Sequence, residues 1–181
     1  MTGFPGERTN RAVALVTDDF RLYHRIVPFM ASRGITILGL APGDPVPPAV
    51  RVLLDGPPAD PRSIPVLDSL EATLLSVYQA LDRRRRQGGY ARVVFGVDPG
   101  HVIGLAVLCD GEVFLVAESM DMQEACDRIA SWSTGLDAKA WEVHVGDGHP
   151  EVGRPLLRLM RERLPGMRVA LTPEGATTPW S

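Results

Sequence analysis

Acidic side chains follow three strands that the second half of the sequence predicts. The acids are Asp98, Asp147 and Glu174. The strands that precede them are predicted at 92–98, 139–146 and 167–171. Helices connect these strands, so we expect the strands to be parallel and their carboxyl ends to share one edge of a sheet. Because neighbouring strands lie about 4.8 Å apart, the three carboxylates can reach a shared cation or two adjacent ones.

Carboxylate oxygens of this kind favour Mg²⁺ or Mn²⁺ as the cofactor. Two such ions stabilise the attacking and the leaving oxygen of a phosphodiester during in-line displacement. The sequence therefore predicts metal-dependent phosphodiester hydrolysis, with Asp98 as the central ligand and with Asp147 and Glu174 as metal-binding and catalytic partners. Asp147 has a second interpretation, because an aspartate at this position could instead cap the helix that follows.

Small and basic residues surround the three acids. The loop residues are Gly100, Gly104, Gly148 and His149. Glycine lets a backbone or a phosphate approach closely, although each glycine could equally serve a turn. The histidine could transfer protons or support a ligand, or it could simply face solvent.

Three arginines on one face of the predicted helix 150–164 form the candidate nucleic-acid contact: Arg154, Arg158 and Arg161. Phosphates of DNA or RNA could lie along them, although exposed arginines on helices often only solvate a surface. The formal net charge is −3, whereas nucleic-acid-binding domains are usually basic overall. Any nucleic-acid contact must therefore be local.

The second half of the chain predicts the element order β-β-β-α-β-α-β. Asp110-Gly111 is a strong hairpin signal between strands at 103–109 and 112–118. Helices are predicted from Asp121 to Gly135 and over 150–164. With right-handed crossovers this order gives a mixed five-stranded sheet in which the strands lie in the order 3-2-1-4-5.

The first half predicts a small α/β domain. Strands at 11–16, 35–40 and 50–54 and a helix over 20–32 make a β-α-β-β unit, which a long helix over 66–86 follows. We expect a domain boundary after this helix, so that the domains cover 1–89 and 90–181. Asp18 and Asp19 follow the first strand, and helix capping accounts for them without a second site.

Composition fits an ordinary globular protein, with 45% hydrophobic and 23% charged residues. The apolar runs are far shorter than the roughly 20 residues that cross a bilayer, and the first ten residues lack the apolar core of a signal peptide. Cys109 and Cys126 are expected to be buried thiols. We therefore expect a cytoplasmic protein with no membrane contact.

Three segments resemble known families. Phe95-Gly96-Val97-Asp98-Pro99-Gly100, with Gly104-Leu105-Ala106-Val107, resembles the first motif of the RuvC and YqgF families of Holliday-junction resolvases. The segment 143–150 resembles the RuvC strand that ends in an acid, and Glu174-Gly175-Ala176-Thr177-Thr178 is similar to a Glu-x-x-Thr-Thr stretch of YqgF. The resemblance covers about residues 91–178.

The resemblance implies a ribonuclease H-like fold, cleavage of branched or structured nucleic acid, and a homodimer matched to a two-fold junction. Those families continue into a last helix with a further catalytic Asp, whereas this sequence stops at Ser181. We therefore expect either a shortened domain or an incomplete site. Two alternatives stay open: a non-catalytic nucleic-acid-binding or scaffold protein, and a nucleotide-binding protein similar to actin or sugar kinases. The sequence does not define the substrate, the role of the first domain or the oligomeric state.

Overall fold

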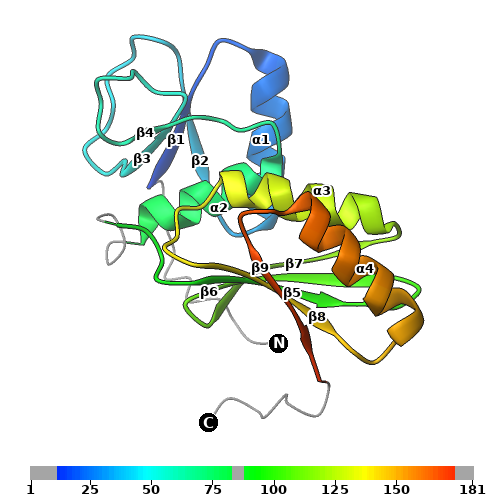
Figure 1. The fold of residues 1–181 in the computed structure, drawn as a ribbon. Coiled ribbons are helices and arrows are strands. Elements are labelled where there is room, and N and C mark those ends of the chain that lie inside the picture. The colour runs from blue at the N-terminus through cyan, green and yellow to red at the C-terminus, as the bar shows by residue number, and fades with distance from the viewer. Residues whose placement is uncertain (1–11, 83–87, 174–181) are drawn as a thin grey trace. The chain divides into compact units, whose positions relative to one another are not determined.

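The protein consists of two compact units, residues 1–84 and 85–181. The computed structural model describes residues 12–82 and 88–173 (Figure 1). Both units are α/β, and each has a sheet of its own. No helix in the described ranges is long and apolar enough to cross a membrane.

The first unit has a parallel sheet in the order β2-β1-β3-β4. Its strands are β1 (Val13–Val16), β2 (Ile37–Leu40), β3 (Val52–Leu54) and β4 (Ser63–Ile64), and its helices are α1 (Phe20–Ser32) and α2 (Leu70–Leu81). Val13, Ala14 and Leu15 of β1 are completely buried, as is usual for a strand inside a parallel sheet. The predicted strand-helix-strand-strand order is confirmed.

Two details of the first unit differ from the prediction. The segment that forms β4 was expected to be a loop, because a two-residue strand in a proline-rich segment is too short to show the alternating pattern of a strand. The long helix was expected from Val66, but α2 begins at Leu70, where the Ser69 side chain accepts a hydrogen bond from the Ala72 amide. The Val66 amide instead donates to the Asp55 carboxylate at 2.8 Å, which holds this segment beside β3. α2 ends at Leu81, and the expected last residues of that helix lie outside the described ranges.

The second unit has a mixed sheet in the order β7-β6-β5-β8-β9. Its elements are β5 (Val93–Asp98), β6 (Ile103–Cys109), β7 (Glu112–Ser119), α3 (Met122–Thr134), β8 (Trp141–Gly146), α4 (Pro150–Arg163) and β9 (Arg168–Thr172). β5, β6 and β7 are antiparallel neighbours, whereas β5, β8 and β9 are parallel. Numbered within the unit, the strand order is 3-2-1-4-5, the arrangement that the predicted element order gives.

One face of this second sheet is covered and the other is open. α3 packs on β6 and β7, and α4 packs on β8 and β9 (Figure 1). Val93, Phe95 and Val97 of β5 point into that core and are buried. On the opposite face no described helix of this unit is packed, and Val116 is 61% exposed. The side of the sheet away from α3 and α4 thus carries exposed side chains such as Val116.

A β-bulge decides which residues of β7 lie on the open face. The hairpin turns at Asp110-Gly111, where both residues have positive φ, as an Asp-Gly hairpin turn requires. The register then shifts between Val107 and Leu108. Because of this shift, Glu118 pairs with Gly104 on the open face.

Candidate functional site

The centre of the candidate site is Asp98, at the carboxyl end of β5. In the antiparallel register Asp98 lies opposite Gly104, and Gly104 lies opposite Glu118 on the next strand. On the other side of Asp98, a Cβ placed on Gly146 would be 3.9 Å from Oδ1 of Asp98. Gly146 in turn pairs with Thr172. The sheet therefore carries one transverse row, Glu118, Gly104, Asp98, Gly146 and Thr172.

A hollow of about 1070 Å³ lies over this row. The next row of the open face also contributes to its lining, through Gly96, Ala106, Val116 and His144. Asp98 and Glu118 are both exposed there. The hollow thus has small residues at its floor and two carboxylates at one end.

Three glycines form the floor, and internal packing does not explain them. A Cβ on Gly96 would come no closer than 3.8 Å to any atom of the protein. On Gly104 and on Gly146 it would approach to 3.4 Å, which is ordinary contact. Glycine inside a strand is destabilising by roughly 0.5–1 kcal/mol relative to alanine, and it often marks a place where a ligand approaches the backbone. These glycines therefore favour a bound ligand over the sheet.

The other predicted acids are placed differently. Asp147 follows Gly146 at the same edge of the sheet, but it does not line the hollow. Glu174 lies outside the described residues. In the ranges 12–82 and 88–173 no three acidic, histidine or cysteine side chains come together to hold a metal. The described site therefore offers two carboxylates, Asp98 and Glu118, which are separated by Gly104.

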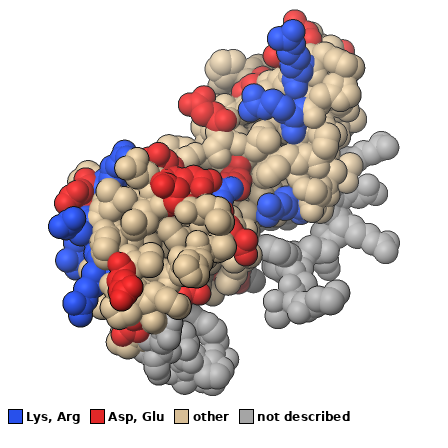
Figure 2. All heavy atoms as spheres, turned by 90° about the vertical axis from the view of Figure 1, so that its right-hand side faces the viewer, with Lys and Arg blue, Asp and Glu red and all other residues tan. Residues whose placement is uncertain are grey.

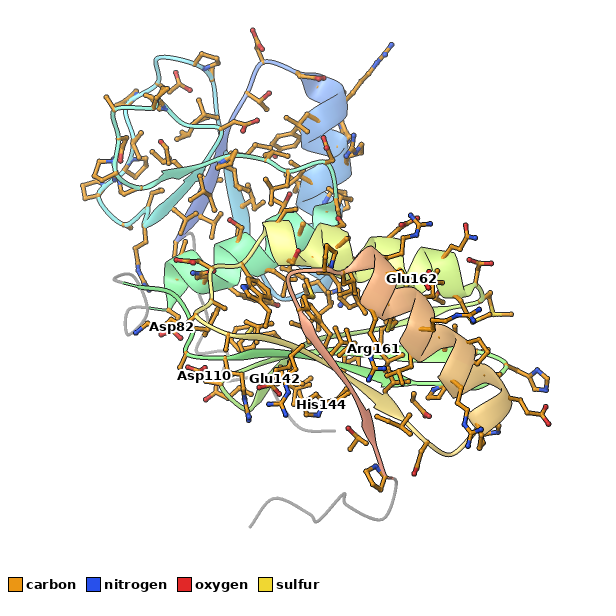
Figure 3. The ribbon with its side chains drawn as sticks, viewed as in Figure 1. Asp82, Asp110, Glu142, His144, Arg161 and Glu162 are labelled. Atoms are coloured by element: carbon orange, nitrogen blue, oxygen red, sulfur yellow. The ribbon has the colours of Figure 1, made fainter. Side chains whose placement is uncertain are left out.

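Glu118 was not identified from the sequence, because its position on the open face depends on the bulge in the hairpin. His144 was also missed. Its Nε2 lies 2.7 Å from Oε2 of Glu142, two residues earlier on β8. Figure 3 shows both side chains on the side of the sheet away from α3 and α4.

Glu142 carries a stable negative charge. The hydrogen bond with His144 is the largest influence that lowers the pKa of Glu142, and partial burial opposes it. The nearby charges of Arg92 and Arg168 lower this pKa further. Nη1 of Arg92 lies 4.0 Å from Oε1 of Glu142. The pair therefore consists of a carboxylate and an imidazole on the open face of β8, and of the two it is His144 that lines the hollow.

The predicted arginines lie on α4, which covers the other face of the sheet. Arg161 donates a hydrogen bond to the carbonyl of Val169 at 3.3 Å, and Arg158 pairs with Glu162 at 4.0 Å. Arg154 is exposed on the same helix. The structure thus does not bring these arginines to the hollow. On the face that Figure 2 shows, basic and acidic side chains of the described residues are interspersed.

The predicted loop residues have local structural roles or lie near the edge of the sheet. A Cβ on Gly100 would be 3.1 Å from the carbonyl of Val102, so this glycine fits a tight turn. Gly148 is exposed, and the exposed His149 is the N-cap residue of α4 without a side-chain cap hydrogen bond. Gly104 alone of this group lines the hollow.

Acids at strand ends of the first unit serve local structure. Asp19 caps α1 by accepting hydrogen bonds from the amides of Arg21 and Leu22 at 2.8 and 3.2 Å. Asp55 has a φ of 51° and binds the Val66 amide, as described above. Capping thus accounts for Asp19, as expected.

Residues 12–83 match the model of a family described as a response regulator receiver-like domain. The match covers the first unit and less than half of the chain. Neither the curated proteins nor the solved structures that were compared include a match to the chain.

Proposed function

We propose that the second unit hydrolyses phosphodiester bonds of structured or branched nucleic acid with the help of a divalent cation. The observation that carries the proposal is the row in which Asp98 and Glu118 flank Gly104 beside an open hollow. The resemblance of the segment around Asp98 to resolvase motifs supports the same chemistry. We also propose that this unit has the ribonuclease H-like fold, because that fold combines an antiparallel three-stranded part with two further parallel strands.

The residues present fit a magnesium or manganese ion. Mg²⁺ usually keeps several waters and is held by one or two carboxylates together with phosphates of the substrate. Asp98 and Glu118 supply such carboxylates, and Gly104 leaves the space between them free of a side chain. The bound ion would activate water and neutralise charge on the phosphate. The protein's own part is to orient the phosphodiester over the glycine floor.

Asp147 and Glu174 remain proposed partners of this site. Asp147 directly follows the adjacent strand β8. The cytoplasmic location and the homodimer are likewise proposals. The homodimer rests on the resolvase resemblance alone.

A specific observation favours one alternative, a nucleic-acid-binding module without catalysis. The described residues hold no group of three metal-binding side chains. The alternative similar to actin or sugar kinases has less support, because the described strands of the first unit are all parallel and form no hairpin like that of the second.

The test is cleavage of labelled Holliday junction, single-stranded DNA and RNA with Mn²⁺. We expect the wild-type protein to cut at least one substrate and Asp98→Asn to lose at least about a hundredfold in rate, since the charge is removed and the size kept. Asp127→Asn on α3 is the matched control, because its exposed carboxylate lies away from the hollow. Equal cutting by wild type and Asp98→Asn would contradict the proposal. Binding without cutting would favour the non-catalytic module.

A further inference from the structure

His144 lines the hollow and forms a hydrogen-bonded pair with Glu142, which the two acids do not account for. The pair lies on β8, the strand next to β5, and its two side chains share the open face. His144 is 37% exposed at its side chain, whereas Glu142 is only 16% exposed. The imidazole is thus accessible while its carboxylate partner is sheltered.

The chemistry of the pair indicates which ring nitrogen carries the hydrogen that points to Glu142. An ionised carboxylate only accepts hydrogen bonds, so Nε2 of His144 must carry the hydrogen that points to Glu142. Nδ1 is then the second nitrogen of the ring, and among the described residues it has no hydrogen-bond partner. A histidine held in this way can give a proton from Nδ1 and take it back.

The register places this imidazole beside Asp98. His144 pairs with Gly96, and Asp98 is two residues further along the same strand and on the same face. Gly96 has no side chain to separate them. The charged groups that face His144 from its own strand and from its neighbours are Asp98, Glu142, Arg92 and Arg168. Asp98 and His144 line the same hollow, so a phosphodiester held at Asp98 would share it with the imidazole.

We propose that His144 is the general acid of the hollow and that Glu142 is its positioning residue. This inference rests on the proposed function. Water attacks phosphorus and forms the new P–O bond while the bond to the leaving oxygen breaks. The protonated imidazole of His144 gives its Nδ1 proton to that oxygen, which departs as an alcohol. The attacking water releases a proton to solvent, and the imidazole later regains one, so that atoms and charge balance.

The experiment uses the full chain and the DNA that is cut best in the screen above. That DNA is synthesised again with sulfur in place of each bridging oxygen of the scissile linkage in turn. A thiol has a pKa of about 8.5, far below that of an alcohol, so a thiolate leaves without needing a proton. The variants are His144→Gln and Glu142→Gln, with His24→Gln on α1 as the matched control.

We expect His144→Gln to cut the all-oxygen DNA about a hundredfold more slowly, within the range of general acid catalysis. The same variant should cut the strand with sulfur at the leaving position at nearly the wild-type rate. Glu142→Gln should show the same pattern with a smaller loss, and His24→Gln should match wild type on both substrates. Circular dichroism of each variant checks that it is folded.

Three results would overturn the inference. If His144→Gln cuts oxygen-linked DNA as fast as wild type while Asp98→Asn does not cut, the proposed function stands and the role of His144 is wrong. If His144→Gln is equally slow on both linkages, the histidine does not act on the leaving group. If wild type cuts none of the substrates, the proposed function and this inference fail together.

Discussion

At the level of single residues, Gly104 gives the sharpest test of the hollow. A Cβ at this position would touch Asp98 at an ordinary 3.4 Å, and its backbone does not need a positive φ. Gly104→Ala should therefore leave stability unchanged or raise it by about 0.4–1 kcal/mol. The added methyl group would stand between Asp98 and Glu118, so we expect cleavage to fall at least tenfold.

Gly39→Ala is the contrasting variant for this prediction. A Cβ there would lie 2.7 Å from the ring of Tyr23, so Gly39→Ala should destabilise the first unit. Urea unfolding and the cleavage assay measure the two effects separately. A fully active Gly104→Ala protein would show that nothing binds between the two carboxylates.

The residues of the site were only partly predictable from the sequence. Asp98 could be found because it closes a strand with a strong apolar pattern. Glu118 could not be found in this way. If the strands paired regularly from Cys109 and Glu112 onward, Glu118 would lie opposite Ile103, whose side chain is in the core. The bulge shifts that count by one residue, and the sequence contains no clear signal for it. His144 was missed because its partner Glu142 precedes it by two residues and forms no known motif.

At the level of elements, the short strand β4 depends on an ion pair in the preceding loop. Arg62 donates to the Asp60 carboxylate at 2.6 Å from Nη2, and to the carbonyl of Val50 at 3.2 Å from Nη1. The side-chain and backbone hydrogen bonds of Arg62 lower the pKa of Asp60 from 3.8 to about 2. The loop is thus held in place just before Ser63.

This pair predicts an acid dependence of stability. Because the pKa of Asp60 is lower in the folded protein, its contribution is fully present above about pH 3.8 and is lost as pH falls to about 2. Asp60→Asn should therefore be less stable than wild type at pH 5, and the difference should shrink as pH falls through this window. Thermal unfolding at pH 5, 4 and 3 measures it, and because the pair is only partly buried we expect the effect to be small and sensitive to salt. A difference that stays constant with pH would contradict this account.

Most elements could be predicted, because their signals are local. α1 spans the predicted 20–32, and α3 begins after Asp121, whose carboxylate accepts hydrogen bonds from the Gln123 and Glu124 amides. The start of α2 differs from the prediction because Ser69 caps the helix, while the Val66 amide before it donates to Asp55, which is far away in the sequence. The capping-box spacing of Asp121 and Glu124 predicted the start of α3, but only the Asp121 half of the box is formed. The Glu124 carboxylate accepts its hydrogen bond from the Ser119 hydroxyl rather than from the cap residue.

At the level of the whole molecule, each sheet is built only from strands of its own unit. We therefore expect residues 85–181 expressed alone to fold and to keep cleavage within a few-fold of the full chain. Residues 1–84 alone should fold and not cleave. Circular dichroism and the cleavage assay check both. An isolated second unit that is folded but inactive, beside an active full chain, would mean that the first unit contributes to the reaction.

The strand order of the second unit followed from its connections, whereas the receiver-like match of the first unit was not anticipated. Three short apolar strands and one amphipathic helix are common to many α/β units. Their order in the sheet, β2-β1-β3-β4, depends on where the chain crosses over between β2 and β3, which the proline-rich segment between them does not reveal.

The bulge in the hairpin has a consequence for mutation. Glu118 and Ser119 of β7 are consecutive, and Glu118 faces the hollow while Ser119 is buried on the side of the helices. Slipping a strand by a single position would exchange these two environments, exposing apolar groups and burying charged ones. We therefore expect that deleting the extra residue of β7 unfolds the second unit and abolishes the proposed activity. Insertions and deletions in these strands thus do not allow specificity to change gradually. Substitutions at alternate positions of a strand change residues of the open face and leave the core unchanged.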